Sequence, residues 1–254
     1  MKKLITIFIL SFLFSCHTDN NDDISQVTVD FNFIHYWDDS KVTNTDFNTI
    51  QYTNANGEAL SIEKLRYLIS KIAFQKLDGE IFVLDGYNLV DVTNGTNLSF
   101  TPTSTIPIGN YSKVSFTFGF NNEDNYDSNY QDLNSASWNV PALLGGGYHF
   151  MQLEGKFIDN TTTETGYAYH AIRAVDNSKT PQEFQNTFFQ IDLDAVSITK
   201  DATFEIKMNI AEWFKNPNAW DLNVLNNMLM PNFNAQVMMF ENGQNVFSLE
   251  SITQ

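Results

Sequence analysis

From Val27 onward the chain alternates apolar and polar residues, which is the period of strands with one buried face. The same alternation recurs over 114–120, 189–193 and 204–210. Asp78-Gly79 lies between two further apolar runs, at 68–74 and 81–84, and is typical of a tight hairpin turn. The pattern predicts an all-β fold, an antiparallel β-sandwich or barrel.

Helices are expected to be few and short. Ser61 can cap one that runs through Leu65, and Asp221 can open another that runs through Leu229, ahead of Pro231. The longest irregular stretch is 121–147, and a loop of that length in a compact domain is usually functional or mobile. No repeat or boundary divides the chain, so we expect one domain over residues 27–254.

The first sixteen residues predict a lipoprotein export signal. Lys2 and Lys3 precede an apolar run that is too short to span a bilayer, and Leu13-Phe14-Ser15-Cys16 is similar to the lipobox of bacterial lipoproteins. We expect a signal peptide over 1–15, a lipid on the thiol of Cys16 and an acidic tether over 16–26. A plain signal peptide that is cleaved nearby is the alternative. Lipidation would place the protein in the bacterial cell envelope, anchored to the outer membrane, with the membrane face left open.

Charge and motifs restrict the function. The chain has 14 Lys and Arg against 30 Asp and Glu, a formal net charge of −16, and its sequence has no basic cluster that would neutralise phosphates. This argues against nucleic-acid binding. The sequence also lacks Gly-x-Ser-x-Gly, a P-loop and His-Glu-x-x-His, and no pair of carboxylates stands out for glycoside hydrolysis. We therefore expect that the protein is not an enzyme.

Calcium is a weaker candidate ligand. Residues 121–132 are dense in oxygen ligands, which Ca²⁺ prefers. They lack the glycine at the sixth position and the final glutamate of an EF-hand loop. A solvated loop is the better interpretation of this segment.

Three of the four histidines are His35, His149 and His170, and each lies at an alternate strand position that we expect to face the core. His149 shares its parity with Met151, and His170 shares its parity with Ala168. A buried imidazole needs hydrogen-bond partners, and convergence on one metal ion would satisfy all three. In a mature domain without cysteine, imidazoles with methionine and aromatic rings nearby favour copper. The alternative is three histidines that are hydrogen-bonded separately in the core or at its rim.

The sequence is similar to the MbnP-like copper-binding domains from about residue 27 to 250. The most specific matching segment is Gly147-Tyr-His-Phe-Met-Gln-Leu-Glu-Gly155. The other segments that carry the resemblance are Val29–His35, Ile62–Ile72, Tyr111–Gly119, Tyr169-His170 and Asn242–Leu249.

That resemblance implies a β-rich copper-binding protein of the methanobactin-associated type. It implies His35 and His170 as copper ligands and His149 as a third. In some members a partner dihaem, peroxidase-like enzyme oxidises a tryptophan ligand to kynurenine. Trp37 and Trp138 are the candidates here, and Trp37 is the better placed because it shares a strand face with His35. Met151 is a candidate for the surroundings of the metal.

We therefore expect a membrane-anchored protein that captures, stores or delivers copper. The alternative is a surface module that binds glycan or protein without metal, and it would present exposed tryptophans in a groove and histidines apart from one another. A purely structural component of the envelope is a third possibility, for which no sequence feature argues.

Overall fold

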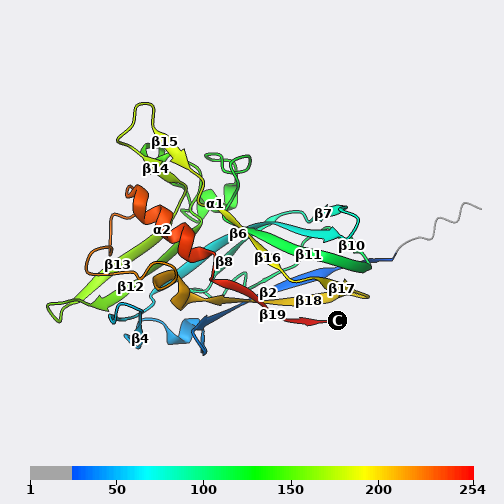
Figure 1. Ribbon diagram of the computed structural model, residues 1–254, viewed down its shortest axis with the longest axis horizontal. Coiled ribbons are helices and arrows are strands. Elements are labelled where there is room, and N and C mark those ends of the chain that lie inside the picture. Colours follow the sequence, from blue (N-terminus) through cyan, green and yellow to red (C-terminus); the bar gives the residue numbers. More distant parts are fainter. Residues whose placement is uncertain (1–24) are drawn as a thin grey trace, which may run out of the picture.

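The computed structural model describes residues 25–254, and its main feature is two curled β-sheets that face each other (Figure 1). The strands of the larger sheet are β4 (Tyr52–Thr53), β5 (Ala59–Leu60), β6 (Lys64–Lys76), β7 (Ile81–Val83), β8 (Tyr87–Asp91), β11 (Gly109–Phe118), β12 (Met151–Ile158), β13 (Glu164–Ala171), β16 (Phe189–Leu193) and β17 (Val196–Ile198). Their main order is β16-β11-β6-β12-β5-β4. In addition, β13 pairs with β12, β17 pairs with β11, and β7 and β8 pair with β6.

The smaller sheet has the order β19-β18-β2-β3, with β9 beside β2. Its strands are β2 (Val29–Trp37), β3 (Ser40–Val42), β9 (Ser99–Phe100), β18 (Ala202–Asn209) and β19 (Phe247–Thr253). Two further pairs are β1 (Gln26–Val27) with β10 (Ile106–Pro107), and β14 (Ala174–Asp176) with β15 (Glu183–Gln185). Gln26, which we placed at the end of the tether, therefore already belongs to a strand.

The all-β prediction is confirmed, with one exception to the antiparallel pattern. Strands β2 and β18 pair in parallel, with Phe31 opposite Phe204. A parallel pair needs a long connection. Here that connection is most of the domain, because β2 is one of its first strands and β18 one of its last.

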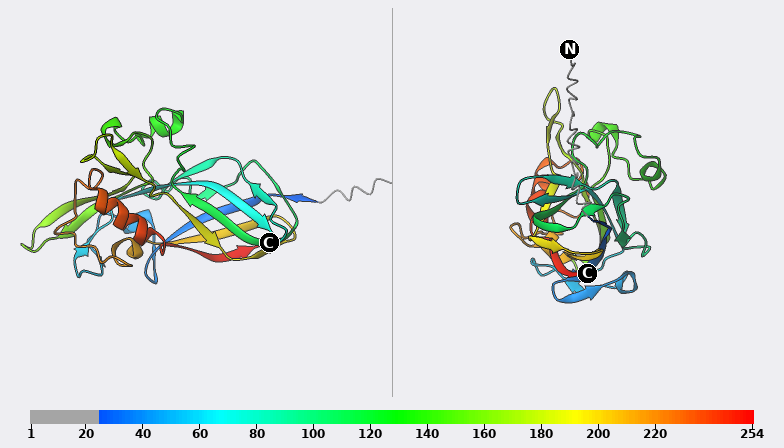
Figure 2. Two further views of the ribbon diagram at one scale, coloured as in Figure 1. Left: turned by 45° about the horizontal axis from the view of Figure 1, so that its top comes forward. Right: turned by 90° about the vertical axis from the view of Figure 1, so that its right-hand side faces the viewer.

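Aromatic rings fill the space between the two sheets. Phe31 of β2 stacks on Phe204 at 5.1 Å between ring centroids and meets the edge of Phe74 of β6 at 6.3 Å. Phe33 contacts Phe116 of β11 in the same edge-on manner. Seen end-on, the strands curl around this core (Figure 2). The residues that the alternation predicts to be buried in β2 are buried.

Neither predicted helix forms. Residues 59–60 and 64–76 are strands, and the Ser61 hydroxyl accepts a hydrogen bond from the Lys156 backbone N–H at 3.0 Å instead of capping a helix. In the second case the Asp221 side chain closes a local turn with the Asn223 backbone N–H at 2.8 Å. The helix of this region, α2 (Phe233–Gly243), begins only after Pro231, and its cap is Asn232, whose side chain accepts from Ala235 N.

Residues 121–147, here called the covering segment, pack over the larger sheet. They contain α1 (Gln131–Ser135) and the 3₁₀ turn η2 (Ala142–Leu144). Leu133 and Trp138 are fully buried in a small core of their own. The Asn125 side chain accepts from Tyr148 N at 2.8 Å, and Asp127 accepts from Gly147 N at 2.5 Å. Oxygen atoms that we considered as calcium ligands therefore hold the segment together.

The predicted signal peptide and Cys16 lie outside the described residues. Within residues 25–254, no helix combines the length and the apolar character that crossing a bilayer requires. The hairpin predicted at Asp78-Gly79 is present, with Gly79 N donating to Lys76 O at 3.1 Å and Gly79 at φ +93°.

At Gly155 of β12, the backbone of Ser61, which lies between β5 and β6, comes very close to the strand. A Cβ there would lie 2.1 Å from the backbone oxygen of Ser61 and 2.8 Å from the ring of Tyr167. That oxygen accepts a hydrogen bond from the Tyr167 hydroxyl at 2.8 Å, and Ser61 N donates to Lys156 O at 2.8 Å. The nearest atom belongs to the backbone, which cannot move aside as a flexible side chain could. The position therefore leaves no room for a side chain.

We expect Gly155→Ala to lower the free energy of unfolding by about 2 kcal/mol or more, because the new methyl group must push backbone atoms apart. The matched control is Gly166→Ala on the paired strand, where the nearest atom to a Cβ is 3.9 Å away and the change should cost less than about 1 kcal/mol. Urea denaturation measures both values. Equal stabilities of the two variants would contradict the close approach.

Candidate metal centre

Three neighbouring strands place polar side chains in rows on one face of the larger sheet. Arg66 of β6 pairs with Gln152 of β12, which pairs with His170 of β13. Lys64 and Glu154 form the next row, two residues along. Side chains two apart in a strand point to the same side, so all five residues share this face. The covering segment lies over it, since the Arg66 guanidinium donates to the backbone oxygen of residue 136 at 3.3 Å.

His170 is oriented by a carboxylate. Its Nε2 lies 2.8 Å from Oε1 of Glu154, and the same oxygen accepts from Lys64 Nζ at 2.8 Å. The hydrogen bond from His170, and then the one from Lys64, lowers the pKa of Glu154 to about 2. Because an ionised carboxylate only accepts hydrogen bonds, Nε2 of His170 is the nitrogen that carries hydrogen. In the neutral ring this leaves the lone pair on Nδ1.

His149 is oriented by a backbone carbonyl. Its Nδ1 and its backbone N both lie 2.9 Å from the oxygen of Trp138. A carbonyl oxygen accepts only, so Nδ1 is the donor and Nε2 holds the lone pair. His149 is 5% exposed, and this burial lowers its pKa to about 4. The imidazole is therefore neutral at physiological pH.

The two imidazoles are neighbours. Their ring centroids are 5.4 Å apart, and the rings meet edge to face at 83°. The Trp138 ring lies 5.7 Å from that of His149, and the Arg66 guanidinium lies 5.0 Å from the Trp138 ring. Across residues 25–254, no group of three or more His, Cys, Asp or Glu side chains is placed to hold a metal ion. The histidine cluster of this face is therefore a pair.

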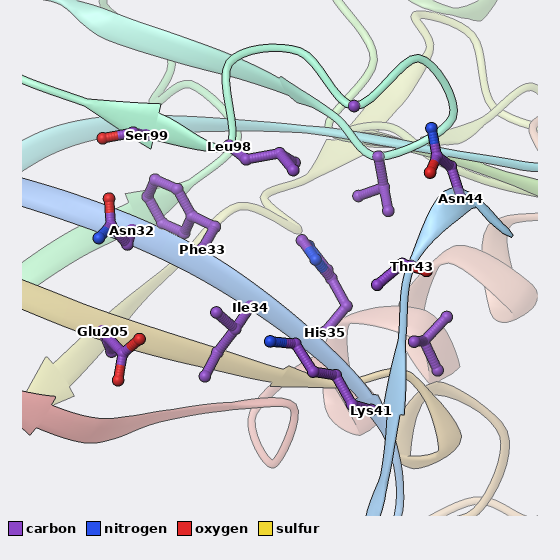
Figure 3. A pocket seen from close by; sticks show the side chains of 13 residues that line it. Asn32, Phe33, Ile34, His35, Lys41, Thr43, Asn44, Leu98, Ser99 and Glu205 are labelled. Carbon is purple, nitrogen blue, oxygen red and sulfur yellow. The ribbon is translucent and has the colours of Figure 1, made fainter. Parts of the chain in front are cut away.

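His35 is not part of this pair, so the prediction that three histidines converge is wrong. Its Nε2 lies 2.9 Å from the hydroxyl of Tyr67, which follows Arg66 on β6 and points to the opposite face, into the core. Burial lowers the pKa of His35 to about 3. Its side chain lines a cavity of about 350 Å³. Figure 3 shows Phe33 and Leu98 beside it in the lining of this cavity.

The parity expected for His170 is also wrong. The core-facing residues of β13 are Tyr167, Tyr169 and Ala171, so His170 and Ala168 lie on the face that the covering segment and α2 border. Tyr169 is buried because its hydroxyl has a buried acceptor, Trp213 O at 2.9 Å. The sequence does not distinguish the two faces of β13, because each carries apolar or aromatic residues. One face has Tyr169 and Ala171, and the other has Ala168.

His149 leaves the parity of Met151 because the chain is irregular at Phe150. Phe150 N donates to Ala171 O, and both Phe150 and Met151 are buried in the main core. Regular alternation therefore begins only at Met151, the first residue of β12. Met151 faces the core, on the side away from His170.

The two candidate tryptophans also separate. Trp37 stacks on Tyr52 at 4.8 Å and contacts Phe214, in the core. Trp138 is fully buried beside His149, and its indole Nε1 finds no hydrogen-bond partner among the described residues. Trp138, which we placed second from the sequence, is therefore the tryptophan at the histidine pair.

The sequence profile of the MbnP family matches residues 26–238. The chain belongs to the MbnP family. The solved structure of MbnP from Methylosinus trichosporium is similar to this MbnP-family chain at a TM-score of 0.52 and 12% identity, over 78% of this chain and 81% of that one. At this identity the likeness establishes the fold alone. A search of curated proteins finds no match.

Protonation of His35 should make the stability of this MbnP-family protein depend on pH. Unfolded, the imidazole has the ordinary pKa of 6.5, and folded it has a pKa of about 3. Below about pH 6.5 the unfolded chain takes up a proton that the folded protein does not. The free energy of unfolding should therefore decrease as the pH is lowered below about 6.5. This residue contributes a decrease of up to about 1.4 kcal/mol per pH unit.

Urea denaturation at about pH 7 and about pH 5 measures this dependence. His149 contributes with the same sign, so His35→Gln, which does not titrate, should reduce the loss and not abolish it. An unchanged pH dependence in the His35→Gln variant would contradict the lowered pKa of His35 in the folded protein.

Proposed function

We propose that this MbnP-family protein binds copper and that His149 and His170 are its ligands. The observation that supports this most is the hydrogen bonding of the two neighbouring rings. Each ring has one nitrogen held by an oxygen acceptor, Trp138 O for His149 and Glu154 for His170, so that in the neutral ring the other nitrogen is the one that can bind a metal. Metal-binding histidines have this arrangement, because the outer acceptor fixes the ring and raises the basicity of the ligating nitrogen.

The surrounding residues fit copper better than a hard cation. Imidazole nitrogen suits copper, whereas Ca²⁺ and Mg²⁺ require several oxygen ligands. The nearest carboxylate, that of Glu154, is occupied by Lys64 and His170. Membership of the MbnP family supports the same metal, since the sequence resemblance implies copper. Bound copper would supply a redox-active, Lewis-acidic ion at the imidazole pair.

Trp138 is the residue that we propose as the oxidised tryptophan. It adjoins His149, and its indole N–H is a buried donor without an acceptor among residues 25–254. Such a donor is uncommon in a well-packed interior. Trp213 Nε1, in the main core, also has no partner among these residues, so it is the contact with His149 that distinguishes Trp138. Conversion to kynurenine would consume two equivalents of hydrogen peroxide, which place one oxygen atom on each carbon of the indole C2–C3 bond as that bond breaks and leave as two waters. Hydrolysis would then release C2 as formate, so that an aniline amine and a ketone replace the N–H of Trp138. A dihaem, peroxidase-like partner is the enzyme that the resemblance implies for this step.

In this proposal the protein captures, stores or delivers copper without catalysing a reaction. A lipid on Cys16 would anchor it to the outer membrane of a bacterial cell envelope, with the described domain beyond the membrane surface. The anionic chain would attract cations to the domain but would not select among them.

The alternative of a glycan-binding surface has less support. It requires exposed tryptophans in a groove. All four tryptophans of the chain are buried, with Trp37 at 7% exposure and Trp138, Trp213 and Trp220 at 0%.

Copper titration of the purified protein tests the ligand assignment. We expect His149→Gln and His170→Gln each to weaken copper binding at least about tenfold, because each removes a nitrogen donor. His35→Gln is the matched control and should leave the affinity within about twofold. Circular dichroism confirms that each variant is folded. Submicromolar copper binding that survives the His149→Gln/His170→Gln double substitution would exclude this site.

Peptide mass spectrometry of protein isolated from its native cells tests the oxidation. We expect the mass increase of kynurenine on the peptide that contains Trp138 and none on the peptide that contains Trp37. The increase should disappear in Trp138→Phe. Modification of Trp37, or an unmodified Trp138 in copper-loaded protein, would contradict the proposal.

A further inference from the structure

A cavity of about 450 Å³ lies against His170, next to the histidine pair. It opens to solvent and is bordered by η2, by β13 and by residues 228–231, and its lining is almost wholly apolar. The lining residues other than His170 are Pro141, Leu143, Leu144, Ala168, Met228, Leu229, Met230 and Pro231. One imidazole and two thioethers are thus the side chains with metal-binding atoms in this lining.

The methionine segment is fixed to the histidine strand by its backbone. Ala168 N donates to Asn226 O at 2.8 Å, which attaches the segment to the edge of β13. The side-chain amide of Gln236 of α2 donates to His170 O at 2.8 Å and to Leu229 O at 3.1 Å. Gln236 is fully buried. It therefore holds the residue between the two methionines at a fixed position relative to His170.

Packing does not account for Met228. Leu229 is 3% exposed and anchors the segment, whereas the side chain of Met228 is 76% exposed. Met228 also has a left-handed backbone, with φ at +53°. A side chain in that conformation costs about 1–3 kcal/mol. The fold thus holds a large apolar side chain in solvent, in a strained conformation, at the rim of a cavity that a histidine lines.

Thioether sulfur is a soft, uncharged ligand that favours Cu(I) among biological metal ions. It has no proton to lose, and an apolar lining penalises a monovalent ion less than a divalent one. We propose that His170, Met228 and Met230 form a binding site for Cu(I). The inference rests on the proposed function in that it takes His170 to be a copper ligand, and it adds a sulfur-containing side that discriminates between oxidation states.

The test is a comparison of Cu(I) and Cu(II) affinities. Cu(I) is titrated anaerobically against the chelator bicinchoninate, and Cu(II) is titrated separately. We expect Met228→Leu/Met230→Leu to weaken Cu(I) binding at least about tenfold and to leave Cu(II) binding within about twofold. Leucine keeps the apolar bulk and removes only sulfur. Met238→Leu on α2, which lies outside the cavity lining, is the matched control and should change neither affinity.

Methyl NMR of protein labelled with ¹³C-methyl methionine gives an independent measurement. Cu(I) should shift the Met228 and Met230 signals and leave that of Met238 in place. The shifts should persist in His149→Gln, because the sulfur site uses His170. Unmoved methionine signals together with wild-type Cu(I) affinity in the double leucine variant would overturn the sulfur site and leave the histidine pair standing. A wild-type protein that binds neither oxidation state would overturn the proposed function itself.

Discussion

The candidate metal centre depends on the antiparallel register of β6, β12 and β13. That register sets Arg66, Gln152 and His170 side by side, and it turns the next residue of each strand toward the core. A slip by one residue would exchange the two faces completely. The contact between Gly155 and the Ser61 backbone lies in the same strand, three residues beyond Gln152, and helps to fix the register.

The covering segment and the larger sheet each supply one hydrogen-bond acceptor for the histidine pair. It supplies Trp138, whose carbonyl oxygen accepts from His149, while the sheet supplies Glu154, which accepts from His170. The two imidazoles therefore receive their tautomers from different parts of the chain. Removing either acceptor would free a ring to rotate, so the geometry of the pair depends on the whole segment over residues 121–147 and not only on β12 and β13.

Alternation in the sequence was sufficient to predict the sheets, because a half-buried strand must repeat every two residues. It failed where a non-local contact decides the outcome. Tyr169 can face inward because Trp213 O accepts its hydroxyl, and the irregular backbone at Phe150 moves His149 to the other face from Met151. The methionines at 228 and 230 gave no sequence signal, since their position beside His170 is set by Gln236 of α2.

The local charges bear on which ion the proposed site would prefer. The chain as a whole is strongly acidic, which raises the concentration of every cation near its surface. At the imidazole pair, however, the carboxylate of Glu154 is neutralised by Lys64, and the guanidinium of Arg66 adds positive charge beside Trp138. A divalent ion that depends on carboxylate oxygens gains little there. An ion that binds through uncharged nitrogen and sulfur would lose nothing by this neutralisation. In the proposed function, the long-range field would therefore attract cations in general, and the local donors would select copper.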